Sequence, residues 1–122
     1  MPTLIACLSS GKGTWIEVIK IINSQQWDKV YLITNQFGKD NFKVPNENVK
    51  LILVDTFQEV SLMIEVIKKA VKISDFEVAL NFVSGTGKEH MAVLEAVMEL
   101  GLNFRLVTLK NNQVVSLGLE GG

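Results

Sequence analysis

The chain has 122 residues, of which 48% are hydrophobic and 20% charged, and its formal net charge is −1. This length and this apolar fraction predict one domain with a substantial core over residues 1–118, followed by a short tail at 119–122. Lysines and glutamates are interspersed and form no basic stripe, which argues against general binding to DNA or to an RNA backbone.

The sequence carries no sign of a membrane anchor or of a leader peptide. Charged residues such as Lys20, Asp28, Lys50 and Asp55 interrupt the long apolar runs. The apolar N-terminus has no basic flank and leads directly into a glycine-rich loop. A single cysteine, Cys7, excludes an internal disulfide. We therefore expect a cytoplasmic protein that has no membrane partner.

Short apolar runs alternate with segments of helical period along the chain. The runs predict strands over residues 3–8, 29–34, 49–55, 76–83, 104–109 and 113–117. The spacing Thr-x-x-Glu after three of these runs predicts helix N-caps at Thr14, Thr56 and Thr86. Residues 35–48 form a polar connector, for which we expect no more than a short helical turn.

Apolar residues at helical spacing mark the faces that the three helices should bury. The stripes are Ile16, Ile19 and Ile22; then Val60, Met63, Ile64, Ile67 and Val71; then Met91, Leu94, Val97 and Met98. Gly101 is a suitable stop for the last helix. Asn111-Asn112 suits a tight hairpin turn between the last two strands.

This alternation predicts a three-layer, Rossmann-like α/β fold, whose mostly parallel sheet ends in a C-terminal antiparallel hairpin. In such sheets, ligands bind beyond the carboxyl ends of the strands, where the strand order reverses. The commonest order places the first and fourth strands side by side at that reversal. Those strands lead into Ser9-Ser10-Gly11-Lys12-Gly13 and Ser84-Gly85-Thr86-Gly87-Lys88.

Both loops contain the residue types that bind anions. Glycines let the backbone approach an anion closely, and the helix that follows offers unpaired N–H groups. Serine and threonine hydroxyls add donors, while Lys12 and Lys88 add charge. One such loop alone is explained equally well by a tight turn between strand and helix. Two loops on neighbouring strands favour a site for a phosphate-bearing ligand.

Neither loop matches a common nucleotide-binding motif. A Walker A loop would need glycine at Phe82 and serine or threonine at Glu89, so an ATPase or GTPase is disfavoured. A dinucleotide-binding fingerprint would need glycine at Ile16.

The segment from Asn81 to Met91, Asn-Phe-Val-Ser-Gly-Thr-Gly-Lys-Glu-His-Met, resembles the Asn-x-Thr-Gly-Gly-Thr-Lys-x-Met loop of CARF domains, the CRISPR-associated Rossmann-fold sensors. This chain has one extra residue between threonine and methionine, and Ser84 stands where the family more often has threonine. The order of elements is similar over nearly the whole chain, whereas the motif covers only this segment.

The resemblance implies binding of a cyclic oligoadenylate second messenger across a homodimer, in which two copies of the loops form one shared basin. No cofactor is implied. The residues expected to bind the ligand are Ser9, Gly11, Lys12, Gly13, Thr34, Asn35, Asn81, Ser84, Gly85, Thr86 and Gly87.

Some CARF-like proteins also resemble ring nucleases, which cut the messenger without a metal. There the ligand's own 2′-hydroxyl attacks the neighbouring phosphate, and the protein fixes the geometry and stabilises charge. The resemblance assigns these catalytic tasks to Ser10, or Ser9, and to Lys88. No effector domain follows the loops, so a lone sensor would act through a separate effector protein, by sequestering the messenger or by degrading it.

Two further hypotheses stay open beside this one. The first is a generic nucleotide- or phosphate-metabolite-binding module of Rossmann type, without messenger-related activity. The second is a small Rossmann-type enzyme that uses another phosphorylated metabolite.

The remaining polar and sulfur-containing candidates have simpler explanations. No His/Cys/Asp/Glu cluster has metal-ligand spacing, so we expect no metal. Cys7 should be inert packing, and His90 a surface or capping residue rather than a general base. Trp15 should pack in the core, with stacking on a base as the alternative. Asp55 should cap a helix rather than contact a ribose.

Overall fold

The computed structural model describes residues 2–9, 12–73 and 77–118, with the side chain of Lys12 excepted. The expected catalytic residue Ser10, the expected ligand-binding residue Gly11 and the tail at 119–122 lie outside the described residues. The elements, in chain order, are β1 (Thr3–Leu8), a 3-10 turn (Lys12–Thr14), α1 (Trp15–Asn23), β2 (Lys29–Thr34), α2 (Gln36–Asn41), β3 (Val49–Leu53), α3 (Val60–Ala70), β4 (Glu77–Asn81), α4 (Gly87–Glu99), β5 (Asn103–Lys110) and β6 (Gln113–Ser116).

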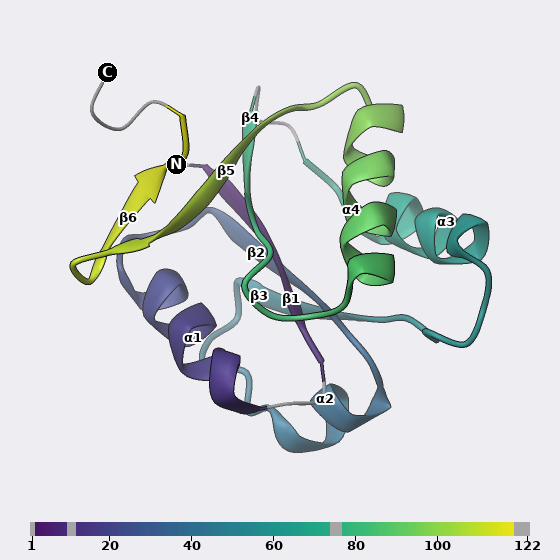
Figure 1. Cartoon of the computed structure of the whole chain (residues 1–122), viewed down its shortest axis with the longest axis horizontal. Coiled ribbons are helices and arrows are strands. Elements are labelled where there is room, and N and C mark those ends of the chain that lie inside the picture. Colours follow the sequence, from purple (N-terminus) through teal and green to yellow (C-terminus); the bar gives the residue numbers. More distant parts are fainter. Residues whose placement is uncertain (1, 10–11, 74–76, 119–122) are drawn as a thin grey trace.

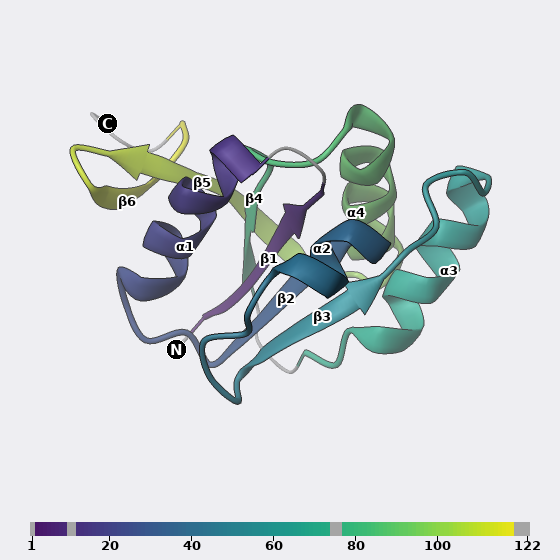
Figure 2. The same cartoon turned by 90° about the horizontal axis from the view of Figure 1, so that it is seen from below.

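The described strands form one six-stranded sheet in the order β3-β2-β1-β4-β5-β6. Strands β1 to β5 run parallel, and β6 pairs antiparallel with β5. The carboxyl ends of the parallel strands therefore share one edge; in Figure 1 the strands β1 and β2 run downward to it, toward α2, and Figure 2 shows the sheet from that lower side. We call it the carboxyl edge. The predicted α/β fold with a C-terminal hairpin is confirmed, and the strand order reverses between β1 and β4.

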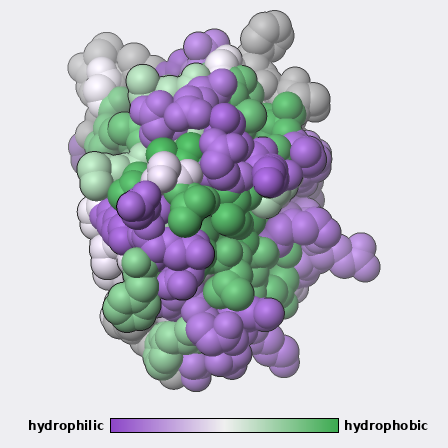
Figure 3. Space-filling view, turned by 90° about the vertical axis from the view of Figure 1, so that its right-hand side faces the viewer, coloured by the Kyte–Doolittle hydropathy of each residue, from purple (hydrophilic) through white to green (hydrophobic). Residues whose placement is uncertain are grey.

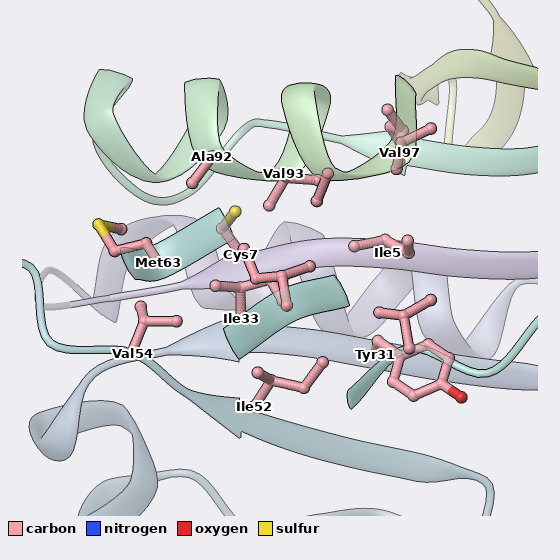
Figure 4. Packing of buried hydrophobic residues seen from close by; sticks show 14 of the residues in the cluster. Ile5, Cys7, Tyr31, Ile33, Ile52, Val54, Met63, Ala92, Val93 and Val97 are labelled. Atoms are coloured by element: carbon pink, nitrogen blue, oxygen red, sulfur yellow. The ribbon is translucent and has the colours of Figure 1, made fainter. Parts of the chain in front are cut away.

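Helices cover both faces of this sheet. On one face, α3 and α4 pack over Ile5 and Cys7 of β1 and Ile33 of β2, through side chains such as Met63 and Val93 (Figure 4). On the other face, α1 packs over alternate residues of the same strands. Because β1 is covered on both sides, all six of its residues are buried, as its continuous apolar run predicts.

Two of the three predicted helix faces are wrong in detail. In α1 the buried residues are Trp15, Val18, Ile21 and Ile22, whereas Ile16 and Ile19 are exposed. In α4 small residues such as Ala92 and Ala96 face the core, and Met91 and Met98 are 59% and 57% exposed. Both helices therefore bury a face next to the predicted one, which still includes Ile22 of α1 and Val97 of α4. The stripe of α3 is confirmed by buried Met63, Ile67 and Val71.

Only one of the three predicted N-caps forms. The hydroxyl of Thr86 accepts a hydrogen bond from the Glu89 N–H, and the Glu89 carboxylate accepts one from the Thr86 N–H. Thr14 makes no such bond, because the 3-10 turn before α1 already gives it helical backbone angles. Thr56 lies in a turn, and α3 begins four residues later, after Glu59. Thr14 therefore occupies the predicted N-cap position of α1 but makes no side-chain capping bond, and the prediction at Thr56 is wrong.

The connector and the hairpin follow their local sequence. Asn35 caps α2 by accepting a hydrogen bond of 3.0 Å from the Gly38 N–H. Asn111 and Asn112 have φ angles of 54° and 61°, the left-handed pair that a tight two-residue hairpin requires. Gly101, with φ of 72°, ends α4 as expected.

The caps supply a matched pair of variants. Thr86→Ala should lower the free energy of unfolding by about 0.5–2 kcal/mol, because the Glu89 N–H loses its acceptor. Thr14→Ala removes no capping bond and should change it by less than about 0.5 kcal/mol. Urea unfolding of the three proteins tests this difference. Equal losses in both variants would contradict the assigned caps.

Candidate functional site

The turn after β4 folds back over the end of β1. Gly85, at φ of 96°, lies so close to β1 that a Cβ at this position would sit 2.8 Å from the Cys7 Cβ. Ser9 follows β1 directly, so the structure brings Ser9 and residues 84–88 to neighbouring places on the carboxyl edge. Gly85 is thus required by the fold itself, through its backbone angle and this close approach.

Several of the predicted ligand-binding side chains are buried, and their residues make hydrogen bonds within the protein. Ser9, Thr34, Asn81 and Ser84 are each less than 5% exposed. The Asn81 side chain donates to the Val107 carbonyl and accepts from the Val83 N–H. The Ser9 carbonyl accepts from the Trp15 indole N–H. These residues hold the two loops in place below the surface.

The accessible donors of this edge are backbone N–H groups at the start of α4. The N–H groups of Gly87 and Lys88 have no acceptor among the described residues. A Cβ at Gly87 or at Gly13 would meet no atom within 4 Å, so both glycines face open space. An approaching anion would therefore meet unpaired amides and the partial positive charge of the helix N-terminus.

Lys88 connects this turn to the segment between β3 and α3. Its ammonium donates a hydrogen bond of 2.7 Å to the Thr56 carbonyl. An ammonium group has three N–H donors, so two remain for other partners. Lys88 is half-buried, and its positive charge lies at the carboxyl edge.

Glu89 places a negative charge directly beneath the same turn. Its side chain is fully buried, and one carboxylate oxygen accepts from the Thr86 N–H at 2.7 Å. The other oxygen has no hydrogen-bond partner among the described residues. The edge is therefore not purely positive, and the Lys88 charge offsets that of Glu89. The Thr-x-x-Glu spacing predicts the cap but gives no sign of this burial.

His90 also supports the turn. Its Nε2 lies 2.8 Å from the Ser84 carbonyl oxygen. A carbonyl can only accept, so Nε2 must carry the hydrogen and donate. The ring stacks on Phe82 at a centroid distance of 4.7 Å. These contacts brace the turn and do not cap the helix, whose N-terminus is capped by Thr86 and Glu89.

Two other candidates are core residues. Trp15 is 6% exposed and packs against the rings of Phe37 and Phe42, which confirms packing over stacking on a ligand base. Cys7 is fully buried. Burial, and secondarily the charge of Glu89, raise the pKa of the Cys7 thiol well above its usual value. A thiol that keeps its proton is a poor nucleophile.

A cavity opens at the same edge, beyond the ends of β2 and β3. Its volume is about 530 Å³. It is lined by Asn35, Gln36, Phe37, Leu53, Val54, Asp55, Thr56, Phe57, Gln58 and Val66. Of the predicted ligand-binding residues only Asn35 lines it, so sequence reasoning missed most of this hollow. Asp55 does not cap α3 but accepts from the Phe57 N–H within the turn.

The residues that the structure describes include no group of three His, Cys, Asp or Glu side chains placed to hold a metal ion. Among the side chains that the structure describes, this edge offers the Lys88 ammonium group, together with backbone amides and a neighbouring hollow lined by amide and aromatic side chains.

The Cys7 thiol makes stability depend on pH. The folded thiol keeps its proton at a higher pH than the unfolded one, so its stabilising contribution is complete below the unfolded pKa of about 8.5 and falls above it. Between about pH 8 and about pH 10 the wild type should lose about 2 kcal/mol more unfolding free energy than Cys7→Ala. Urea titrations of both proteins measure this loss. Parallel pH profiles would contradict it.

Comparison with known proteins identifies no relative. The sequence matches no protein-family model, and a search of curated proteins finds no match. Among the helices that the structure describes, none is long and apolar enough to span a membrane. The geometry of the carboxyl edge is therefore what supports a function for this chain.

Proposed function

We propose that the chain binds a phosphate-bearing nucleotide at the carboxyl edge, with the phosphate at the turn of residues 84–88. The observation that carries this proposal is that the N–H groups of Gly87 and Lys88 have no acceptor among the described residues. Gly87 also faces open space, so an anion can approach these two groups. Amides fixed at a helix N-terminus need no reorganisation to receive an anion.

The charges at this turn make Lys88 decisive for binding a phosphate. The buried carboxylate of Glu89 repels a phosphate, whereas the Lys88 ammonium attracts it and has two N–H donors left beyond its bond to Thr56. Loss of the Lys88 charge would leave Glu89 as the nearest full charge on this turn. Lys88 should therefore contribute more to binding than a lysine on an open surface does.

The CARF resemblance extends the proposal to a cyclic oligoadenylate held between two copies of the chain. A ring with several phosphates would meet the turn of residues 84–88 once from each copy. Exposed apolar side chains support such an assembly, because they gather on the face that carries α3 and α4 (Figure 3). Val83, Met91 and Met98, around the turn and along α4, are 36%, 59% and 57% exposed.

Cleavage of the ring is the enzymatic form of this proposal. The ligand's 2′-oxygen would bond to the adjacent phosphorus and lose its proton, while the bond from phosphorus to the 5′-oxygen breaks and that oxygen takes a proton. The products are a 2′,3′-cyclic phosphate and a free 5′-hydroxyl. Lys88 would stabilise the negative charge that develops on the phosphate oxygens.

A single nucleotide bound by one chain is the second candidate. The cavity of about 530 Å³ lies within one copy and adjoins Lys88 through Thr56. It needs no partner chain to be complete. This candidate corresponds to the generic nucleotide-binding module.

Calorimetry with cyclic tetra-adenylate, cyclic hexa-adenylate and AMP, without metal, tests the proposal. Lys88→Ala should weaken binding by about 1.5–3 kcal/mol, roughly ten- to 150-fold, since a charge-assisted hydrogen bond is lost. Lys69→Ala removes the same charge from an exposed position on α3 and is the control. Gly87→Ala should also weaken binding. Its methyl group contacts no atom of the fold but occupies the space through which the phosphate would approach the amides.

Each outcome separates the alternatives. Linear products that disappear in Lys88→Ala support cleavage, and tight binding without products supports a sensor. Light scattering should then give a dimer with the ring bound. Binding of AMP alone, to a monomer, supports the second candidate. No binding of any of the three ligands at high micromolar protein refutes the proposal.

A further inference from the structure

One residue that lines the cavity beyond β2 and β3 has a nearly fully exposed aromatic ring. Phe57 is 97% exposed and lies on a turn that Asp55 fixes twice. The Asp55 carboxylate accepts from the Phe57 N–H at 2.9 Å, and the Asp55 carbonyl accepts from the Gln58 N–H at 3.0 Å. These hydrogen bonds hold the backbone that carries the ring, while the ring itself is open to solvent. Removing such a ring from water on binding is strongly favourable.

Amide side chains around the ring keep hydrogen-bonding groups available. Gln36 donates to Asp40 through its Nε2, which leaves its carbonyl oxygen. Asn35 accepts from Gly38 through its Oδ1, which leaves its NH₂ group. Donors and acceptors thus lie side by side in one hollow. The edge of a purine base offers the same mixture, and carboxamides pair well with it.

Charge decides which part of a nucleotide fits here. None of the residues lining the cavity, all within the described part of the chain, carries a positive charge, and Asp55 carries a negative one. A phosphate is therefore excluded, whereas an uncharged ring is not. The Lys88 ammonium bonds the carbonyl of Thr56, a residue of the cavity wall. The positive charge thus lies beside the cavity, where it could meet the phosphate of a nucleotide whose base is in the cavity.

We infer that this cavity is the base-binding subsite of the nucleotide site, and that it takes a purine-type base stacked on Phe57. This inference rests on the proposed function, because it pairs the cavity with the phosphate turn of residues 84–88. The volume of about 530 Å³ lies within the range of ordinary small-molecule sites.

Amide NMR shifts with adenosine and with AMP test the two parts of the site separately. Adenosine, which has no phosphate, should shift the amides of residues 55–58 only. AMP should shift those amides and also the amides of Gly87 and Lys88. Guanosine and cytidine, titrated in parallel, compare a second purine with a pyrimidine.

Phe57→Ala is the decisive variant, because an exposed ring can be removed with little effect on the fold. It should weaken adenosine and AMP at least about fivefold, since base stacking on an aromatic ring is lost. Lys88→Ala should weaken AMP much more than it weakens adenosine, because only AMP loses a phosphate contact. Leu62→Ala, at a half-exposed α3 position outside the cavity lining, controls for loss of apolar surface.

The inference is overturned if adenosine shifts no amide of residues 55–58, or if Phe57→Ala binds adenosine as the wild type does. The same holds if cytidine binds as tightly as adenosine. Shifts at 55–58 that depend on protein concentration without ligand would assign the cavity to a second copy, which also overturns it. If AMP shifts Gly87 and Lys88 in any of these cases, the proposed function stands without the subsite. If adenosine binds and AMP binds no more tightly than adenosine, the proposed phosphate site at residues 84–88 is refuted, while the base-binding subsite stands.

Discussion

The close approach of Gly85 to Cys7 is the constraint on which the carboxyl edge depends. A positive φ at Gly85 folds the turn onto the end of β1, and there is no room for a side chain between them. The reciprocal bonds of Thr86 and Glu89 then start α4 at a fixed point. The turn covers the Glu89 side chain of this cap, whereas Thr86 is exposed, so a buried carboxylate lies beneath the unpaired amides of Gly87 and Lys88.

This arrangement divides the polar groups at the edge into two sets. Ser9, Asn81 and Ser84 are buried and take part in hydrogen bonds that hold the turns. Gly87 and Lys88 keep their N–H groups accessible. Buried residues that fix the position of accessible hydrogen-bonding groups are the usual requirement for a binding site that need not reorganise. The fixed turn around Phe57 repeats this division at the neighbouring cavity.

Local sequence patterns predicted the parts of this structure that depend on neighbours in the chain. The cap at Thr86, the hairpin at Asn111-Asn112 and the buried run of β1 are examples. The same capping pattern misplaced the start of α3, because Asp55 forms a competing turn with Phe57. The cavity and the burial of Glu89 arise when segments distant in sequence meet. No spacing within one segment could reveal them.

The two glycines of the turn after β4 are under different steric constraints. Position 85 is fixed by the fold, since any side chain there meets β1, whereas position 87 has free space around it. Alanine or serine at position 87 is compatible with the fold, whereas the same residues at position 85 are not. Retention of glycine at position 87 among relatives would thus record a history of ligand binding, separately from the history of the fold.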